Sequence, residues 1–237
     1  MDKPFRFKQF TVRQDRCAMK VGTDGVLLGA WAALDKDPAS ILDIGAGSGL
    51  LALMLAQRSA AETIDALEIE ENAYEQCVEN FEASPWADRL FCYHANFDEF
   101  VAEWDDRYDL IVCNPPFFSE DVSSGNAFRD AARQNITLPF EELLNGVSIL
   151  LSKDGIFVTI IPYKEETDFL VHADSLGLYP QQITRVRGNP TAKIKRSLLQ
   201  IGFERTEVDI DTLTIELDRH EYTPDYRALT EAFYLKM

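Results

Sequence analysis

The sequence predicts an α/β fold: a doubly wound, mostly parallel seven-stranded sheet with an antiparallel closing strand. From residue 39 onward, short β-rich runs alternate with helical segments, which is the order expected when helices flank a parallel sheet. A glycine-rich turn at residues 45–49 joins a strand to a helix. The run Tyr108–Cys113 is strongly apolar, as expected for a central strand covered on both faces.

The elements are expected in the following order. Before the sheet, Thr23 can cap a helix that runs to about Ala33. Strands are expected at the apolar β-type runs, Ser40–Ile44, Thr63–Ile69, Leu90–Tyr93, Tyr108–Cys113, Gly155–Ile161, Tyr179–Arg187 and Ser197–Glu204. Helical patterns occupy Leu50–Arg58, Asn72–Glu82, Phe140–Leu151 and Lys164–Leu176.

Proline and glycine mark several boundaries of these elements. Pro162 ends the strand before it because proline cannot donate to a sheet, and Gly177 ends the helix before it. The last two strands can pair as an antiparallel hairpin around a basic loop. After them, Leu213–Leu217 is expected as an edge strand and Asp225–Leu235 as a last helix. The stretch 114–135 has no regular pattern, and a loop that long is usually functional or disordered.

Length and composition favour a single globular domain. The 237 residues divide into an N-terminal extension (1–38), a core (39–204) and a C-terminal strand and helix (205–237). Hydrophobic residues make up 46% of the chain, enough for a packed core. The longest apolar stretch, 41–56, is shorter than the ~20 residues of a membrane span, and the N-terminus lacks the apolar region of a signal peptide. We therefore expect a cytoplasmic protein with no membrane contact and no obligate protein partner.

Cysteine and histidine spacing argues against a metal. The four cysteines are far apart, without a Cys-x-x-Cys pair, and His94, His172 and His220 are isolated. This pattern predicts neither a metal site nor a disulfide framework. It offers no Ser/His/Asp set for nucleophilic catalysis either.

The charge is strongly acidic overall but unevenly distributed. Lys and Arg total 23 and Asp and Glu total 40, a net charge of −17. Residues 1–20 nevertheless carry six basic residues against two acidic ones, and the segment 185–196 carries five basic residues and no acid: Arg185, Arg187, Lys193, Lys195 and Arg196. Screening acts over ~8 Å at physiological salt, so a basic patch can attract phosphate locally. The net charge therefore does not exclude a nucleic-acid partner.

The glycine-rich turn reads Asp43-Ile-Gly-Ala-Gly-Ser-Gly49 and opens a helix. Glycines at such a turn let a ligand approach the N-terminus of the helix closely. A dinucleotide fingerprint that starts at Gly45 would need glycine where Leu50 stands, which weakens that interpretation. The pattern with Asp43, Gly45, Gly47 and Gly49 matches instead the methionine-binding loop of S-adenosylmethionine-dependent methyltransferases.

Polar residues at the ends of the next two strands are candidates for cofactor contacts. Glu68 stands 19 residues beyond Gly49, and an acid about 20 residues on accepts hydrogen bonds from ribose hydroxyls in doubly wound folds. Glu70 and Glu71 are close enough in sequence to be alternative candidates for this contact, and either could instead lie in the first turn of the following helix. Asn96 occupies the place where methyltransferases of this class often put an Asp that binds the adenine amino group, and its amide oxygen can accept the same bond.

The sharpest signal is Asn114-Pro-Pro-Phe117, directly after the apolar strand. Prolines end the sheet stiffly and leave carbonyl groups free to face a cleft. The Asn114 side-chain oxygen and the Pro115 carbonyl can accept hydrogen bonds from both N–H groups of an exocyclic amine. These bonds direct the lone pair of the amine nitrogen at a methyl donor. Pro116 completes the turn, and Phe117 can stack on a planar substrate. Positioning and electrostatics then provide the catalysis without a strong base.

Together these motifs resemble class I methyltransferases with an N-P-P-F motif, which have a Rossmann-like fold. Several stretches, Phe7–Phe10, Asp15–Asp24, Leu42–Gln57 and Ala232–Leu235, further resemble the bacterial valine-tRNA adenine N6-methyltransferases that modify position 37. The resemblance implies S-adenosylmethionine as methyl donor, S-adenosylhomocysteine as product, and tRNA as partner. It also implies that Lys20, Thr23 and Asp24 line the cofactor pocket and that the basic residues of 185–196 meet tRNA.

Other enzymes share the N-P-P-[FY] motif because they also methylate a planar amino nitrogen. Protein-glutamine methyltransferases usually carry a helical domain before the sheet, where this chain has about 39 residues. Methyltransferases that act on adenine or guanine in ribosomal RNA remain a second alternative, although the guanine enzymes often carry a duplicated domain. A non-enzymatic scaffold would be expected to lose Asn114 or the glycines, and this chain keeps them.

Overall fold

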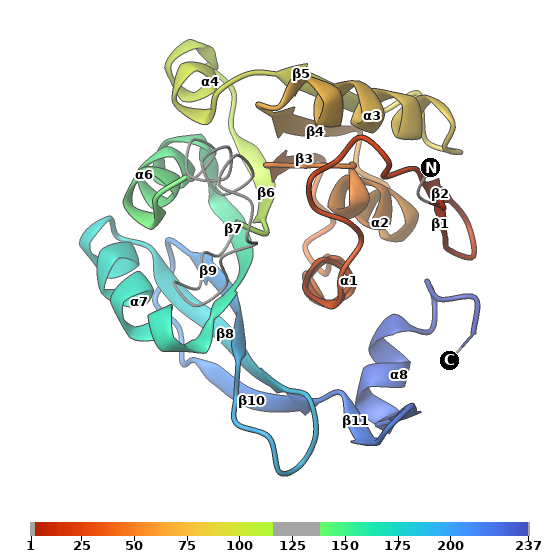
Figure 1. Ribbon diagram of the computed structural model, residues 1–237. Coiled ribbons are helices and arrows are strands. Elements are labelled where there is room, and N and C mark those ends of the chain that lie inside the picture. Colours follow the sequence, from red (N-terminus) through yellow and green to blue (C-terminus); the bar gives the residue numbers. More distant parts are fainter. Residues whose placement is uncertain (1–2, 116–137, 237) are drawn as a thin grey trace, which may run out of the picture.

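One central sheet of eight strands organises residues 3–115 and 138–236, which are the residues that this computed structural model describes. The strand order is β10-β8-β9-β7-β6-β3-β4-β5. The strands are β3 (Ser40–Ile44), β4 (Thr63–Glu68), β5 (Leu90–His94), β6 (Tyr108–Cys113), β7 (Leu151–Pro162), β8 (Tyr179–Arg187), β9 (Arg196–Gly202) and β10 (Asp209–Thr214). Strands β3 to β7 run parallel, and β9 is antiparallel to both β7 and β8 (Figure 1).

The predicted α/β fold is confirmed, with an eighth strand added at the edge. Strand β10 pairs parallel with β8, and it ends at Thr214 rather than spanning Leu213–Leu217. The chain after it forms a separate hairpin, β11 (Glu216–Asp218) with β12 (Glu221–Tyr222). Sequence reasoning misplaced β10 because most of its side chains are polar and exposed, so no apolar run marked it.

Helices cover both faces of the sheet. One face carries α1 (Thr23–Trp31), α2 (Leu50–Arg58), α3 (Glu71–Glu82) and α8 (Pro224–Thr230), and the other carries α4 (Phe97–Glu103), α6 (Phe140–Leu150) and α7 (Glu166–Ser175), preceded by a short 3-10 turn at Tyr163–Glu165. Alternate strand residues point to opposite faces. In β6, Leu110 and Val112 therefore join the core under α1 and α2, while Ile111 joins the core under α6.

Several helix boundaries differ from the prediction. Helix α1 ends at Trp31, and Gly22 rather than Thr23 is its N-cap, with no side-chain cap bond. Helix α8 begins one residue earlier than predicted, where the Thr223 side chain caps it by accepting from the Tyr226 N–H, and it ends at Thr230 rather than at Leu235. Helix α4 was not predicted, since seven residues are too few for a clear apolar period.

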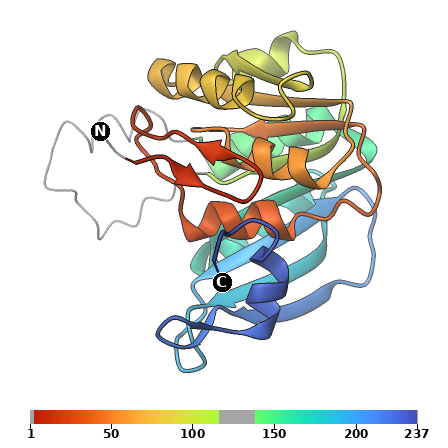
Figure 2. The same ribbon diagram turned by 90° about the vertical axis from the view of Figure 1, so that its right-hand side faces the viewer.

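The two ends of the chain lie side by side. A short N-terminal hairpin joins β1 (Phe5–Arg6) to β2 (Thr11–Val12), and Phe7 forms an antiparallel bridge with Tyr234. The Lys8 N–H donates to the Phe233 carbonyl over 2.8 Å. Figure 2 shows this hairpin and the C-terminal segment on the same side of the molecule. Within the described residues, no helix has the length and apolarity that a membrane crossing requires.

Candidate active site

The glycine-rich loop leaves one side open and packs tightly on the other. Gly45, Gly47 and Gly49 have φ angles of 72°, 56° and 79°, in the left-handed region that favours glycine. A Cβ atom added at Gly45 or Gly47 would meet no atom of the described residues within 4 Å, whereas one at Gly49 would lie 2.5 Å from Cε1 of Phe81. The first two glycines therefore border open space, and the third fixes the start of α2 against α3.

Glu68 holds this loop from the neighbouring strand. Strand β4 pairs parallel with β3, so Glu68 emerges beside the loop. Its Oε2 accepts from the Gly47 N–H over 2.7 Å and its Oε1 from the Glu70 N–H over 2.9 Å. Only 7% of Glu68 is exposed, and burial raises its pKa. A carboxylate offers about four lone-pair sites, so these contacts leave capacity to accept from a ligand hydroxyl.

Asp43 is a fully buried acid at the end of β3. Its Oδ2 accepts from the Ala52 N–H over 3.1 Å, and Oδ1 has no hydrogen-bond partner among the described residues. Burial raises the pKa of this carboxyl to about 7. A buried oxygen without a partner costs ~1–3 kcal/mol. A ligand that brings a cationic donor to this position would remove that cost and favour the carboxylate.

Asn114 lies where the chain leaves β6, next to the glycine-rich loop. Cys113 of β6 pairs with Ile44 of β3, so Asn114 and Gly45 both follow paired residues. Asn114 is half-buried and Pro115 is buried. A Cβ atom on Gly25 would lie 3.8 Å from Nδ2 of Asn114, which places the first turn of α1 beside the amide. Pro116, Phe117 and the segment 118–135 lie outside the described residues.

An ion pair joins two segments that the sequence assigned to different ligands. Asp24, expected at the cofactor, accepts through Oδ2 from Nε of Arg196, expected at tRNA, over 2.8 Å. Thr23 lines a pocket to which no residue of the glycine-rich loop contributes, and Lys20 is exposed. Asp24 and Arg196 are 172 positions apart, so local sequence patterns could not predict their ion pair.

Two of the basic residues expected at tRNA have partners inside the protein. Arg185 makes a bidentate contact with the buried Glu166, with distances of 3.2 Å from Nε and 2.7 Å from Nη2. Arg187 donates through Nε to Oγ1 of Thr214 over 2.8 Å and through Nη1 to the Pro190 carbonyl. Lys193 and Lys195, by contrast, are exposed on the loop between β8 and β9.

Asn96 is the N-cap of α4. Its side-chain oxygen accepts from the Asp98 N–H over 3.0 Å, and the residue is exposed at the end of β5. An amide oxygen has two lone pairs, so this bond leaves one acceptor position. A contact between Asn96 and a bound adenine stays a prediction.

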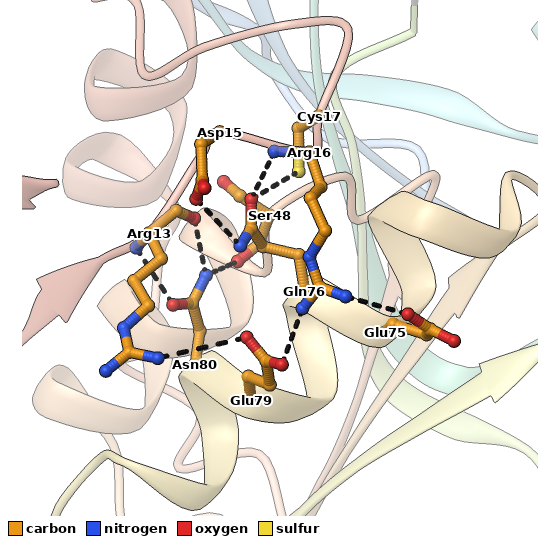
Figure 3. Close-up of polar contacts among 9 residues, drawn as sticks. All are labelled: Arg13, Asp15, Arg16, Cys17, Ser48, Glu75, Gln76, Glu79 and Asn80. Atoms are coloured by element: carbon orange, nitrogen blue, oxygen red, sulfur yellow. Dashed lines mark hydrogen bonds and ion pairs between the residues drawn. The ribbon is translucent and has the colours of Figure 1, made fainter. Parts of the chain in front are cut away.

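A buried pair of amides on α3 ties the N-terminal segment to the glycine-rich loop (Figure 3). Nδ2 of Asn80 donates to the carbonyls of Arg13 and Ser48, and its oxygen accepts from the Arg13 N–H. The Gln76 oxygen accepts from the Arg16 N–H over 2.8 Å, and its amino group donates to Asp15. Asn80 and Gln76 are 2% and 1% exposed.

Sequence reasoning missed both amides, although a signal existed. Gln76 and Asn80 are four residues apart and share one helix face with Ala73, Cys77 and Phe81, all buried. Polar residues on an apolar helix face need hydrogen-bond partners. Their partners are backbone groups of Arg13 and Arg16, the Asp15 carboxylate and the Ser48 carbonyl of the loop, so the amides hold the segment that leads to residues 20–24 against the loop.

We expect Asn80→Ala to weaken ligand binding at the glycine-rich loop and to destabilise the fold. The change removes the side chain from the Arg13 N–H and from two carbonyl groups, and buried unpaired groups cost ~1–3 kcal/mol each. Thermal unfolding and titration calorimetry measure the two effects. Glu79→Ala is the control, because its contacts with Arg13 and Arg16 are at the surface. Equal losses in both variants would contradict the role of the buried amide.

The sequence of this chain is similar to those of known methyltransferases. A family model described as "Methyltransferase small domain" matches residues 25–137. A tRNA1(Val) (adenine(37)-N6)-methyltransferase of Flavobacterium johnsoniae is 60% identical over 98% of this chain and 100% of that protein. Proteins with the same description from Christiangramia forsetii and Bacteroides fragilis are 59% and 46% identical, covering 100% of this chain and 99% and 100% of their own lengths.

Solved structures with low sequence identity share the fold. A predicted O-methyltransferase from Agrobacterium tumefaciens has a TM-score of 0.67 at 22% identity, over 89% of this chain and 96% of that chain. A ribosomal protein L11 methylase from Lactobacillus delbrueckii has a TM-score of 0.54 at 18% identity, over 76% of this chain and 77% of that chain. These two likenesses support the architecture and say nothing about substrate.

Proposed function

Because this chain belongs to the family of the tRNA1(Val) (adenine(37)-N6)-methyltransferases, we propose that it transfers a methyl group from S-adenosylmethionine to the N6 amino group of adenine 37 in a valine tRNA. The observation that carries the proposal is the position of Asn114, which leaves β6 beside the glycine-rich loop. S-adenosylhomocysteine is then the second product. We further propose that the enzyme works in the cytoplasm, as a single domain of residues 1–237.

The residues around the loop fit this methyl donor. Gly45 and Gly47 border open space, Asp43 has an unpartnered buried oxygen, and Glu68 has free lone pairs. Asp43 would accept from the ammonium group of the methionine moiety and Glu68 from the ribose hydroxyls, while Asn96, Lys20, Thr23 and Asp24 would line the remainder. Bound S-adenosylmethionine supplies an electrophilic methyl group on a sulfonium.

Asn114 and Pro115 activate the adenine amine by position. The Asn114 side-chain oxygen and the Pro115 carbonyl accept hydrogen bonds from the two N–H groups of the amine. These bonds reduce the delocalisation of the nitrogen lone pair into the ring. Partial burial of Asn114 strengthens these bonds. The nitrogen gains positive charge as it is methylated, the two oxygens stabilise that charge, and the proton then passes to solvent water. Pro116 and Phe117 are proposed, by family resemblance, to stiffen the turn and to stack on the adenine.

A substrate comparison tests this function. Purified enzyme is given labelled S-adenosylmethionine with tRNA1(Val), with the same tRNA carrying guanine at position 37, or with a protein that carries an acceptor glutamine. We expect label only in the first tRNA, at N6 of adenine 37 by nucleoside mass spectrometry. The guanine-37 tRNA should bind without being methylated, since its amino group stands elsewhere on the ring. Labelling of the protein alone would overturn the assignment.

We expect Glu68→Ala to weaken S-adenosylmethionine binding by about tenfold or more. A hydrogen bond to a charged group is worth ~1.5–3 kcal/mol, and the same carboxylate also holds the Gly47 and Glu70 amides. Glu68→Gln keeps one oxygen acceptor, so its loss should be smaller. Titration calorimetry measures both variants. Unchanged affinity in Glu68→Ala would exclude this residue from the ribose contact.

We expect the double replacement of Lys193 and Lys195 by alanine to weaken tRNA binding without changing S-adenosylmethionine affinity. Each lost phosphate contact should lower the slope of log affinity against log salt by about one. Arg196 stays in place because it pairs with Asp24. The control replaces Lys36 and Lys153 with alanine, which removes the same charge at the opposite end of the sheet. There the Lys36 ammonium donates to the Asp154 carbonyl. Equal salt slopes in both double variants would contradict the proposed tRNA face.

A further inference from the structure

A second pocket lies beside the candidate active site. Its volume is ≈ 460 Å³, and five segments distant in sequence build it. Four aromatic residues line it, Phe5, Tyr222, Tyr226 and Tyr234, together with the acidic Glu216 and the basic Lys236. Of the residues assigned to the methyl donor, Thr23 alone contributes to its lining; none of the glycine-rich loop residues does, nor does Glu68. It is therefore a separate cavity from the one assigned to the methyl donor.

Backbone contacts fix the walls of this pocket. The bridge between Phe7 and Tyr234 and the bond from the Lys8 N–H to the Phe233 carbonyl join the two ends of the chain. On the other side, the Glu216 N–H donates to the Gly188 carbonyl over 2.9 Å. Phe5 and Tyr234 have ring centroids 6.2 Å apart, and Tyr222 and Tyr226 are 5.2 Å apart. The rings are thus held in place before any ligand binds.

The chemistry of the lining matches an unpaired nucleotide. Aromatic rings stack on a nucleobase whatever its identity. The Glu216 carboxylate can accept from an amino or imino group on the edge of the base, and Lys236 can pair with a phosphate. A purely apolar ligand would leave both charges without partners. A free anion would be repelled by Glu216 and would not use the rings.

The pocket is also close to the residues that act on the adenine. Val21, Gly22 and Thr23 form part of its wall. The next residue, Asp24, pairs with Arg196, and Gly25 comes close to the amide of Asn114. Gly188, also in the lining, begins the loop that carries Lys193 and Lys195. A polynucleotide that follows this loop and delivers one base to Asn114 would pass the mouth of the pocket.

We propose that this pocket binds a second, unstacked nucleotide of the tRNA anticodon loop, next to the adenine that is methylated. The inference rests on the proposed function, since it needs tRNA as substrate. Removing adenine 37 from the loop stack exposes the neighbouring base. Seating that base among the tyrosines stabilises the opened loop and sets the register in which adenine 37 reaches Asn114.

A double-mutant cycle between protein and RNA tests the proposal. Tyr222→Ala removes one ring, Tyr222→Phe keeps the ring, and Tyr179→Ala is the control, a half-buried tyrosine at the far end of β8. Each protein is titrated with anticodon stem-loops that carry an abasic site at one loop position at a time. Tyr222→Ala should weaken binding of the intact stem-loop by about tenfold, the scale of one lost base–aromatic stack. S-adenosylmethionine affinity and the melting temperature of the holoprotein serve as checks.

The nucleotide that occupies the pocket is identified as the one loop position at which the losses of binding free energy from Tyr222→Ala and from the abasic site do not add. At that position, the abasic site should weaken wild-type binding about tenfold and should leave Tyr222→Ala almost unaffected. Tyr222→Phe should behave as wild type. Additive losses at every position overturn the proposal, as does equal weakening by Tyr179→Ala. Competition by adenosine or guanosine monophosphate without any abasic coupling would assign the pocket to a free nucleotide instead. Absence of methylation of intact tRNA by the wild type would refute the proposed function itself.

Discussion

Replacing Asn114 with alanine should lower the turnover of tRNA methylation by about 100-fold or more while leaving S-adenosylmethionine affinity nearly unchanged. Removal of one group that stabilises charge in a transition state typically costs 10²–10³-fold in turnover. Asn114 follows β6 at the edge of the loop rather than inside it, so its side chain serves the amine and not the methyl donor. Single-turnover kinetics with saturating tRNA separates this loss from weaker tRNA binding.

A second substitution at the same position distinguishes chemistry from packing. Asn114→Asp keeps an oxygen that can accept from the adenine amine, so it should retain more activity than Asn114→Ala. Both variants lose the amide nitrogen that faces Gly25. If the two lost activity equally, the amide would act through its contact with α1, and the proposed activation of the amine would be wrong. Normal turnover in Asn114→Ala would make the motif structural.

Alanine in place of Gly49 should destabilise the whole fold by about 2–5 kcal/mol, whereas alanine in place of Gly47 should mainly abolish S-adenosylmethionine binding. At Gly49 the new Cβ would lie 2.5 Å from Cε1 of Phe81 and 2.9 Å from Sγ of Cys77, at a φ of 79°. Overpacking costs ~1–3 kcal/mol, and a left-handed alanine costs ~1–2 kcal/mol more. At Gly47 the added atom meets no atom of the described residues within 4 Å, so only the backbone cost applies to folding.

Chemical denaturation and calorimetry separate the two outcomes. Gly47→Ala should lose only the ~1–2 kcal/mol of a left-handed alanine in stability, but at least tenfold in S-adenosylmethionine affinity, because its Cβ would occupy the open side of the loop. Gly49→Ala should unfold at lower denaturant. Loss of binding without loss of stability in Gly49→Ala would contradict the packing described for α3. Full affinity in Gly47→Ala would move the methyl donor away from this side of the loop.

The sequence by itself determined the central elements and the identity of the chemistry-bearing groups. The bounds of β3, α2 and β6 agree with the prediction to the residue, because buried strands and a helix buried over its first seven residues leave apolar runs with clear ends. The glycine-rich loop, Glu68 and Asn114 stand at strand ends, and parallel strands bring their carboxyl ends to one edge. Local spacing was therefore enough to predict that these groups gather there, although their roles stay predictions.

Only the tertiary structure decided which polar residues already have partners. The sequence does not distinguish the environments of the five basic residues in 185–196. In the structure Arg185 binds Glu166 and Arg196 binds Asp24. Lys193 and Lys195 are exposed. The pocket between Phe5, Tyr222 and Tyr234 likewise exists only because both ends of the chain pack against α1 and α8. Periodicity and spacing report what happens within about one element of the chain. Contacts over more than a hundred residues depend on how strands are ordered in the sheet, and that order appears nowhere in the local pattern.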